Sequence, residues 1–398
     1  MTKYDFVVIG SGPAGQRAAI QAAKLGRTVA LIERSFSIGG ACVHTGTIPS
    51  KTLREAVLYL SGWRQRGFYG RSYRVKERIT AEDLMQRLDI TIRHEIEILM
   101  HKLHRNFVDT IAGNAVFESP HVLRIETGSD EVKLIEADKI LIATGSRPVQ
   151  PPGIPFDCPN VVDSDNILDM QELPRTVVVV GAGVIGVEYA AMLSALDIGV
   201  TLVDGRTDIL GFLDREIVDE FTHHLRDRGV SLRLGETVQS VEVIDDKKLV
   251  VHLASGKHIR ANMALFASGR VSNTDKLRLE NAGLTPDSRG RLEVDANFAT
   301  AVPHIYAAGD VIGFPALAST SMEQGRQAAA HAFNGVVKAT NDIFPFGIYA
   351  VPEMSVVGKT EEELRSAGVA YETGIARFRE TSRGQILGLR EGLLKLLV

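Results

Sequence analysis

The stretch YDFVVIGSGPAGQRAAIQAAKLGRTVALIE, residues 4–33, decides the fold of this chain. It opens with a short apolar run rich in β-branched residues, which is typical of a buried parallel strand. Glycines, a helical segment and a second strand follow in the order of a dinucleotide-binding βαβ unit. The predicted elements are a strand at Tyr4–Ile9, a helix at Gln16–Leu25 ended by Gly26, and a strand at Thr28–Ile32.

Each glycine after the first strand has its own task in such a unit. Gly10 makes the tight turn, Gly12 lets the backbone approach a pyrophosphate, and Gly15 lets helix and strand pack closely. The helix N-terminus then offers free N–H groups to the phosphates. Glu33 closes the second strand, where it is placed to accept hydrogen bonds from a ribose. A bare glycine turn would explain the glycines but not the ordered strand, helix, strand and acid around them.

A second unit of the same kind lies further along the chain. It has the same order of strand, glycines, helix, strand and terminal acid, and the acid stands as far from its first glycine as in the first unit. Two such units predict two bound dinucleotides, one for each domain. The elements of the second unit are a strand at Thr176–Val180, glycines at Gly181, Gly183 and Gly186, a helix to Leu196, and a strand at Val200–Val203 that ends at Asp204.

Composition describes a soluble protein of two or three domains. The chain has 398 residues, 44% hydrophobic and 24% charged, with a net charge of −4. The absence of long charge runs argues against nucleic acid or an anionic membrane as a partner. The cysteines, Cys42 and Cys158, are too few for a disulfide framework, which fits a cytoplasmic location. The N-terminus lacks a signal-peptide pattern. The apolar stretch Thr176–Leu196 contains glycines and Glu188, so a strand, turn and helix explain it better than a membrane span.

The rest of the sequence predicts an α/β fold with two Rossmann-like domains and a partial α+β interface domain. Prolines in residues 148–155 mark a linker between the first two. The predicted domains are 1–147 with 271–345 for one dinucleotide, 148–270 for the other, and 346–398 for the interface. Further helices are predicted at 53–65, 81–105, 319–333 and from 361, strands at 139–143, 263–267, 304–310, 355–357 and 392–398, and an antiparallel meander within 107–142.

Three histidines lie on the long amphipathic helix predicted at 81–105. They are His94, His101 and His104, and the last two are spaced as helical neighbours. A metal site is one interpretation, but no carboxylate or cysteine pattern completes it. A solvated helix face is preferred, and the sequence predicts no metal.

The loop GGACVHTGTIPSK, residues 39–51, lies just beyond the first βαβ unit. In the flavin-dependent disulfide reductases the corresponding loop has two cysteines with four residues between them, followed by Pro-Ser-Lys. Here Cys42 occupies the first cysteine position and Thr47 the second. Together with YAAGDVIG at 306–313 and PEMSVVGKT at 352–360, this loop resembles that of the class I pyridine nucleotide-disulfide oxidoreductases, which include lipoamide dehydrogenase, glutathione reductase and mercuric reductase. The resemblance covers nearly the whole chain, and Thr47 points to the NAD(P)⁺ transhydrogenase branch (Si-specific type).

The resemblance implies FAD as cofactor, with NAD(H) and NADP(H) as substrates. It assigns Thr47, Lys51 and Glu188 to the catalytic centre, with Glu188 beside Lys51 near the flavin. From the residues alone, the preferred interpretation of Lys51 is a surface lysine at a helix start. Glu188 is equally well explained as an acid favoured by the helix dipole, and Asp310 as a cap of the following turn. The implied cofactor-binding residues are Gly10, Gly12, Gly15, Glu33, Cys42, Thr47, Lys51, Gly145 and Asp310 for FAD, and Gly181, Gly183, Gly186, Glu188, Asp204, Arg206 and Gly269 for the nicotinamide dinucleotide.

A site without a dithiol cannot pass electrons to a disulfide. The expected reaction is therefore hydride exchange between flavin N5 and nicotinamide C4, in a ping-pong cycle from NADPH to NAD⁺. Lys51 would stabilise negative charge on the reduced flavin, and Glu188 would hold its ammonium. Cys42 is then a packing residue, with a single-thiol redox role as the minor alternative. Other activities left open are an NAD(P)H:acceptor reductase acting on quinones or dyes, and a non-catalytic nucleotide-binding protein.

The nucleotide preference is open from the sequence. Asp204 favours a free ribose 2′-hydroxyl, whereas Arg206 suits a 2′-phosphate, and the pair together would suit a pocket that accepts both nucleotides. A solvated loop arginine is the alternative for Arg206. Members of the family usually continue some tens of residues further. We therefore expect a chain truncated within the interface domain, which leaves the homo-oligomer of the family an open question.

Overall fold

The computed structural model describes residues 1–70, 72–127, 132–335, 343–389 and 391–398. The chain divides into two compact units. The first unit is Met1–Ser50, Asp89–Arg147 and Arg270–Thr340, and the second unit is Lys51–Leu88, Pro148–Gly269 and Asn341–Val398.

The first unit is built on a seven-stranded sheet in the order β3-β2-β1-β6-β5-β4, with β17 also paired to β6. The strands β3, β2, β1, β6 and β17 run parallel, and β4, β5 and β6 form an antiparallel meander. The meander is shorter than the sequence predicts, because β3 joins β2 in parallel instead. The strands are β1 (Thr2–Ile9), β2 (Val29–Glu33), β3 (Asp109–Ala112), β4 (Asn114–Ser119), β5 (Val122–Glu126), β6 (Val132–Ile142) and β17 (Ile305–Ala307).

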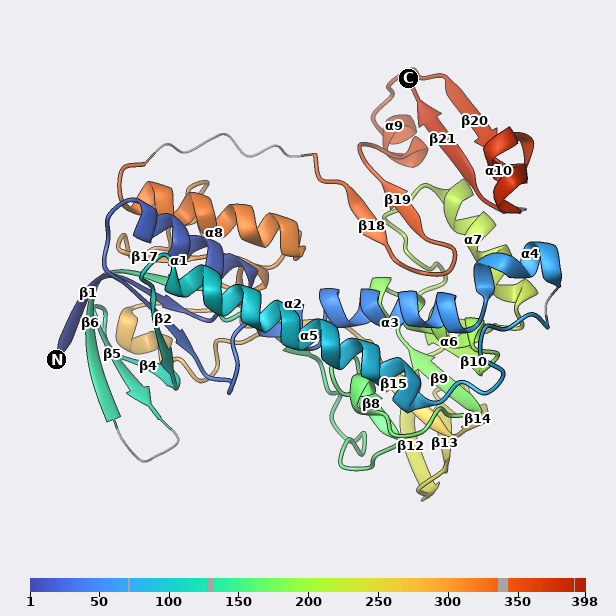
Figure 1. Cartoon of the computed structure of the whole chain (residues 1–398), viewed down its shortest axis with the longest axis horizontal. Coiled ribbons are helices and arrows are strands. Elements are labelled where there is room, and N and C mark those ends of the chain that lie inside the picture. The colour runs from blue at the N-terminus through green and yellow to red at the C-terminus, as the bar shows by residue number, and fades with distance from the viewer. Residues whose placement is uncertain (71, 128–131, 336–342, 390) are drawn as a thin grey trace. The chain divides into compact units, whose positions relative to one another are not determined.

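The second half of β1, residues 6–9, is buried on both faces, which explains why its side chains are all apolar. Phe6 and Val8 pack in one cluster with the alanines of α1 (Pro13–Lys24) and α8 (Ala318–Ala332), whereas Val7 and Ile9 pack in a second cluster on the other face. Figure 1 shows α8 alongside α1. The two helices approach closely at Gly325, where an added Cβ would lie 2.0 Å from the Ala14 carbonyl oxygen. Small residues therefore set the spacing of this layer.

The second unit contains a five-stranded parallel sheet in the order β11-β10-β9-β15-β8. One face packs on the antiparallel meander β12-β13-β14, through a core that includes Val178, Val251 and Phe266. The sequence pattern does not predict the elements within residues 205–262, which contain a helix, one strand of this sheet and the whole meander. The elements are β8 (Val161–Asp163), β9 (Thr176–Val180), α6 (Val184–Ala195), β10 (Gly199–Asp204), α7 (Arg215–Asp227), β11 (Ser231–Leu234), β12 (Val238–Asp245), β13 (Lys248–Leu253), β14 (His258–Ala261) and β15 (Met263–Phe266).

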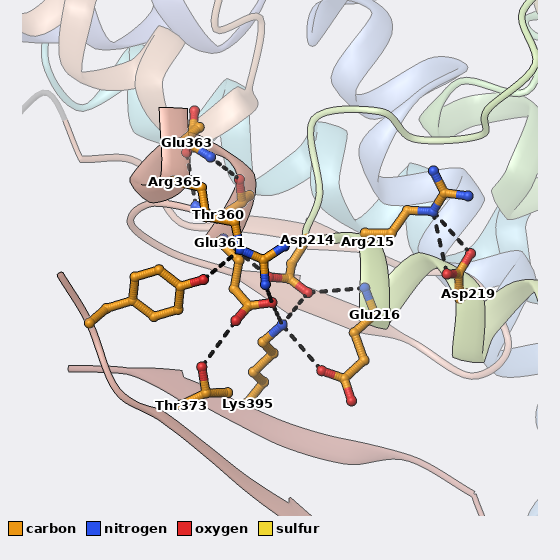
Figure 2. Close-up of polar contacts among 11 residues, drawn as sticks. Asp214, Arg215, Glu216, Asp219, Thr360, Glu361, Glu363, Arg365, Thr373 and Lys395 are labelled. Carbon is orange, nitrogen blue, oxygen red and sulfur yellow. Dashed lines mark hydrogen bonds and ion pairs between the residues drawn. The ribbon is translucent and has the colours of Figure 1, made fainter. Parts of the chain in front are cut away.

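The C-terminal part of the second unit is attached through a buried lysine. The Lys395 side chain is only 4% exposed, and its ammonium contacts Asp214 at 2.8 Å, Glu361 at 2.9 Å and Glu216 at 3.2 Å (Figure 2). Asp214 caps α7 by accepting the Glu216 N–H. The lysine thus joins the last strand to the starts of α7 and α9. The elements here are β18 (Phe346–Ile348), β19 (Met354–Val356), α9 (Glu361–Ser366), β20 (Thr373–Arg377), α10 (Ser382–Leu387) and β21 (Leu393–Leu397).

The helix that follows the Cys42 loop starts earlier than the sequence predicts. The predicted start was Leu53, but α3 begins at Thr47. Pro49 is tolerated there because the N–H groups of a first helical turn have no intrahelical acceptor. Within the described ranges, no helix is both long and apolar enough to cross a membrane. The remaining elements are α2 (Gly40–His44), α3 (Thr47–Leu60), α4 (Arg66–Tyr69), α5 (Ala81–His104), β7 (Ser146–Pro148) and β16 (Arg270–Ser272).

Candidate functional site

The first glycine loop has a shape that only glycine allows at two of its three positions. Gly10 has φ +103°, and an added Cβ would lie 2.4 Å from the Ala143 carbonyl oxygen. At Gly15 an added Cβ would lie 1.9 Å from the Gly10 carbonyl oxygen. At Gly12 it would meet nothing within 4 Å. The protein therefore requires glycine at the outer positions, and the open middle position is where a ligand would approach.

Glu33 ties this loop to the end of β2. Its Oε2 accepts hydrogen bonds from the Ser11 N–H at 3.0 Å and the Ser11 hydroxyl at 2.6 Å, and its Oε1 accepts one from the Ser35 N–H at 2.8 Å. All of these donors are neutral. The acid is thus oriented at the carboxyl end of its strand, where a ribose is expected to bind.

The start of the Cys42 loop lies against the glycine loop within the first unit. The Gly39 N–H donates to the Ser11 hydroxyl at 2.9 Å, and a Cβ added at Gly40 would lie 2.8 Å from the Gly12 Cα. Gly40 has φ +60°, so a glycine suits it on both counts. Backbone rather than side chains therefore lines this junction.

The same edge of the sheet carries polar groups from the ends of β6 and β17. The Asp310 carboxylate accepts a hydrogen bond from the Ser146 hydroxyl at 2.8 Å, next to Gly145 with φ +67°. The hydroxyls of Thr45 and Thr144 are buried without a hydrogen-bond partner. Buried hydroxyls usually have partners, so these two, with the open Gly12 position, fit a polar dinucleotide such as FAD.

The second glycine loop repeats the geometry of the first. Gly181 has φ +108°, and an added Cβ would lie 2.4 Å from the Ala267 carbonyl oxygen. At Gly186 the added Cβ would lie 1.8 Å from the Gly181 carbonyl oxygen, and at Gly183 it would meet nothing within 4 Å. Gly269, with φ +109° and open space around it, lies beyond β15. This loop fits a second dinucleotide by the same criterion.

Asp204 differs from Glu33 because a cation covers it. Its Oδ2 accepts hydrogen bonds from the Ala182 N–H at 2.6 Å and from Arg206 Nη2 at 2.8 Å, and its Oδ1 accepts from Arg206 Nε at 3.0 Å. Burial acts to raise the pKa of Asp204, but the hydrogen bonds from Arg206 and Ala182 outweigh it and the pKa lies below its ordinary value. Arg206 remains 62% exposed, so it is paired and yet accessible to a ligand.

Lys51 and Glu188 form an ion pair within the second unit. Helix α6 is apolar on all sides, and Glu188, its one charged residue, is 5% exposed. Such a buried carboxylate needs a partner, and Lys51 Nζ lies 2.9 Å from its Oε2. The two residues come from α3 and α6, so the fold brings together what the sequence separates. The pair is the one contact predicted between catalytic candidates, and the structure contains it.

The sequence pattern does not identify two further residues at this pair. The Tyr349 N–H donates to Glu188 Oε1 at 2.8 Å, and Lys51 Nζ lies 4.8 Å from the centre of the Tyr349 ring. Arg54, one turn after Lys51 on α3, is buried and donates to the Ala350 carbonyl at 2.8 Å. Arg54 lies three residues after Lys51, and this helical spacing could have placed it on the same face of α3. Nothing comparable marked Tyr349.

The positions of the remaining candidates do not by themselves define a chemical role. Cys42 lies in α2 with a half-buried side chain, and Thr47 is the first, exposed residue of α3. His94 and His101 lie on α5 beside Glu97, in a shallow depression. In the part of the chain that the structure describes, no group of three or more His, Cys, Asp or Glu side chains is arranged to hold a metal.

Known proteins match the chain over its full length. A family model described as pyridine nucleotide-disulphide oxidoreductase matches residues 4–325, and the dimerisation domain of that family matches residues 344–398. The soluble pyridine nucleotide transhydrogenase of Mycobacterium tuberculosis (strain ATCC 25177 / H37Ra) is 53% identical over 399 residues, which is 100% of this chain and 85% of that protein. The protein of the same name from Klebsiella pneumoniae is 43% identical over 99% of this chain and 84% of its own length.

Solved structures show the same fold. The HOCl-induced flavoprotein disulfide reductase RclA from Escherichia coli matches with a TM-score of 0.89 and 30% identity, over 99% of this chain and 86% of that one. LpdA from Mycobacterium tuberculosis matches with a TM-score of 0.91 and 27% identity, over 100% of this chain and 87% of that one.

Two dinucleotide loops in one chain of this fold define a flavin-dependent oxidoreductase that uses nicotinamide nucleotides. The chain belongs to the pyridine nucleotide-disulphide oxidoreductase family. It is accordingly an FAD-dependent enzyme with NAD(P)(H) as substrate, and the predicted fold class and cofactors are confirmed.

Proposed function

We propose that this enzyme transfers hydride from NADPH to NAD⁺ through FAD, as a transhydrogenase of the Si-specific type. The observation that carries the proposal is the combination of Thr47, in the place of the second cysteine, with the Lys51–Glu188 pair one helical turn further on. The site thus lacks a thiol relay but keeps a positioned cation. The names of the relatives from Mycobacterium tuberculosis and Klebsiella pneumoniae support this activity.

The chain's own residues would divide the work as follows. Bound FAD supplies hydride exchange between its N5 and the nicotinamide ring. Lys51 supplies a fixed positive charge where negative charge develops during transfer, and Glu188 keeps that ammonium in place. Gly10, Gly12 and Glu33 hold the adenosine side of FAD. No side chain in this scheme acts as a nucleophile.

The ribose end of the nicotinamide nucleotide would meet Asp204 and Arg206. A 2′-hydroxyl can donate to the Asp204 carboxylate, whereas a 2′-phosphate would draw the exposed Arg206 guanidinium away from it. The same pair can therefore serve NAD(H) and NADP(H) in turn. A ping-pong cycle needs such a site, because both nucleotides use it in succession.

The domain assignment is part of the proposal. Residues 1–147 and 271–345 would bind FAD, 148–270 would bind the nicotinamide nucleotide, and 346–398 would belong to the interface of a homodimer. The match of residues 344–398 to a dimerisation domain supports the last assignment. We further propose a cytoplasmic location, which the low cysteine content and the soluble relatives favour.

An anaerobic titration tests the activity. Addition of NADPH to the FAD-loaded protein should bleach the flavin absorbance, and addition of NAD⁺ should restore it with formation of NADH. Lys51→Met should slow both steps by about 100-fold while FAD stays bound. Bleaching by NADPH without recovery by NAD⁺ would indicate an NAD(P)H:acceptor reductase. Absence of bleaching would indicate a nucleotide-binding protein without turnover.

A further inference from the structure

The segment that follows β18 contacts both members of the Lys51–Glu188 pair. The Tyr349 N–H donates to Glu188 Oε1 and Lys51 Nζ donates to Oε2, so both oxygens of this buried carboxylate have a donor. The Lys51 ammonium also lies 4.8 Å from the centre of the Tyr349 ring, within the range of a cation–π contact. One tyrosine thus touches the carboxylate through its backbone and the ammonium through its ring.

The backbone around Tyr349 is held firmly. Its neighbours Ile348 and Ala350 are buried, whereas the tyrosine itself is 43% exposed. Arg54 donates from Nε to the Ala350 carbonyl at 2.8 Å and pairs through Nη2 with Glu353 at 2.9 Å. Helix α3 therefore presents Lys51 and Arg54 from successive turns to the same short segment. These contacts fix the backbone of the segment that carries Tyr349, although its ring is partly exposed.

A glycine makes room for the ring. A Cβ added at Gly347 would lie 3.1–3.4 Å from the ring and hydroxyl atoms of Tyr349, which is tighter than ordinary contact. Gly347 does not have a positive φ, so alanine would keep the backbone and act on the ring alone.

We propose that Tyr349 is a positioning residue that fixes the Lys51 ammonium between the Glu188 carboxylate and its own ring. A lysine side chain has many rotamers, and the ring and the carboxylate together select one of them. The inference rests on the proposed function, in which a fixed cation at Lys51 speeds transfer. It adds a residue from the C-terminal part of the chain to that centre.

The test uses the FAD-loaded protein with Tyr349→Leu, Tyr349→Phe and Gly347→Ala, and with Gly374→Ala as a matched control. An added Cβ at Gly374 meets nothing within 4 Å, and its φ is not positive. The first measurement is the rate of flavin bleaching by NADPH over a range of nucleotide concentrations. The second is the rate at which acetic anhydride modifies Lys51, followed by mass spectrometry with the exposed Lys248 as internal reference.

Tyr349→Leu should lower the limiting rate about tenfold, leave the half-saturating NADPH concentration within about twofold, and raise Lys51 acetylation several-fold. Tyr349→Phe should match the wild type because it keeps the ring, and Gly347→Ala should fall between the two. Normal bleaching and normal acetylation in Tyr349→Leu would overturn the proposal. If that variant does not fold, Gly347→Ala decides by the same two criteria. Acetylation does not depend on turnover, so failure of the proposed transfer reaction would leave this test intact.

Discussion

The two glycine loops of this enzyme have nearly the same backbone, but the acids that end the two βαβ units have different hydrogen-bond partners. Gly15 and Gly186 have almost identical close approaches, with an added Cβ at 1.9 Å and 1.8 Å from the carbonyl oxygen of the first glycine. Glu33 accepts hydrogen bonds only from neutral donors of Ser11 and Ser35 among its described contacts, whereas Asp204 is paired with the Arg206 guanidinium. The backbone thus sets the capacity to bind a dinucleotide, and the group around the acid sets which ribose is accepted.

The largest effect is expected from closing each loop separately. Gly15→Ala forces a methyl group into the Gly10 carbonyl and should abolish FAD loading, whereas Gly186→Ala should leave FAD bound but prevent its reduction by NADPH. We expect a loss of at least about 100-fold in the affected function in each case. FAD content of the purified protein and anaerobic bleaching by NADPH measure the two effects.

Matched controls come from the middle glycines. Gly12→Ala and Gly183→Ala add a methyl group to open space, so thermal unfolding of the protein without nucleotide should change little. Each variant should still bind the nucleotide of its own loop more weakly, because the methyl group occupies the position where the pyrophosphate approaches. A Gly15→Ala protein that retains full FAD, or a Gly186→Ala protein that is reduced normally, would refute the assignment of the loops.

Both βαβ units could be predicted from the sequence because their determinants are local. The apolar strand, the glycines and the closing acid lie within one stretch of chain in each unit, and the structure has these elements in place. The start of α3 was predicted six residues too late, because Pro49 reads as a helix breaker unless it is known to occupy the first turn. Residues 205–262 carry a meander whose strands are partly exposed and weakly patterned.

The catalytic candidates also differ in whether their contacts could be predicted from the sequence. Lys51 and Glu188 were assigned through the family resemblance, and their 2.9 Å contact is set by tertiary packing that no spacing in the sequence encodes. Tyr349 was missed because its contact to Glu188 comes from a backbone N–H, which every residue except proline has. The pairing of Arg206 with Asp204 was foreseen only as two separate preferences, although the residues are two positions apart.

The two units also differ in how their last elements are held, and Lys395 tests that difference. Lys395→Met would leave Asp214, Glu216 and Glu361 together without their buried cation, at a cost of about 3 kcal/mol. Hydrogen exchange should become faster in α7 and α9 but not in α1. Lys248→Met, which removes a lysine that is 71% exposed, is the control and should change neither. Equal loosening of α1 would show that the two units do not unfold separately.

Arg206→Ala should make the second loop resemble the first in its charge. The variant loses the cation that would meet a 2′-phosphate but keeps Asp204, so the preference for NADPH over NADH should fall about tenfold. The measurement is the dissociation constant of each nucleotide for the FAD-loaded protein. Arg215→Ala is a suitable control, since Arg215 is also exposed and also pairs with an aspartate, Asp219. Equal weakening of both nucleotides would mean that Arg206 holds the loop rather than the phosphate.

The smallest effect concerns pH and follows from the covered acid of the second loop. Hydrogen bonds from Arg206 and Ala182 outweigh burial and hold the pKa of Asp204 below its ordinary value. The folded state therefore releases this proton more readily than the unfolded state, and the resulting stability is present above the unfolded pKa and lost as pH falls through the folded pKa. In Asp204→Asn this contribution is absent at every pH. The difference in melting temperature between wild type and Asp204→Asn should thus shrink as the pH falls below about 3.9, the ordinary pKa of an aspartate. The exposed Asp246→Asn variant should follow the wild type throughout. A difference that stays constant on acidification would mean that Asp204 stabilises the fold through its shape and hydrogen bonds. The position of Arg206 would then not depend on the negative charge of Asp204.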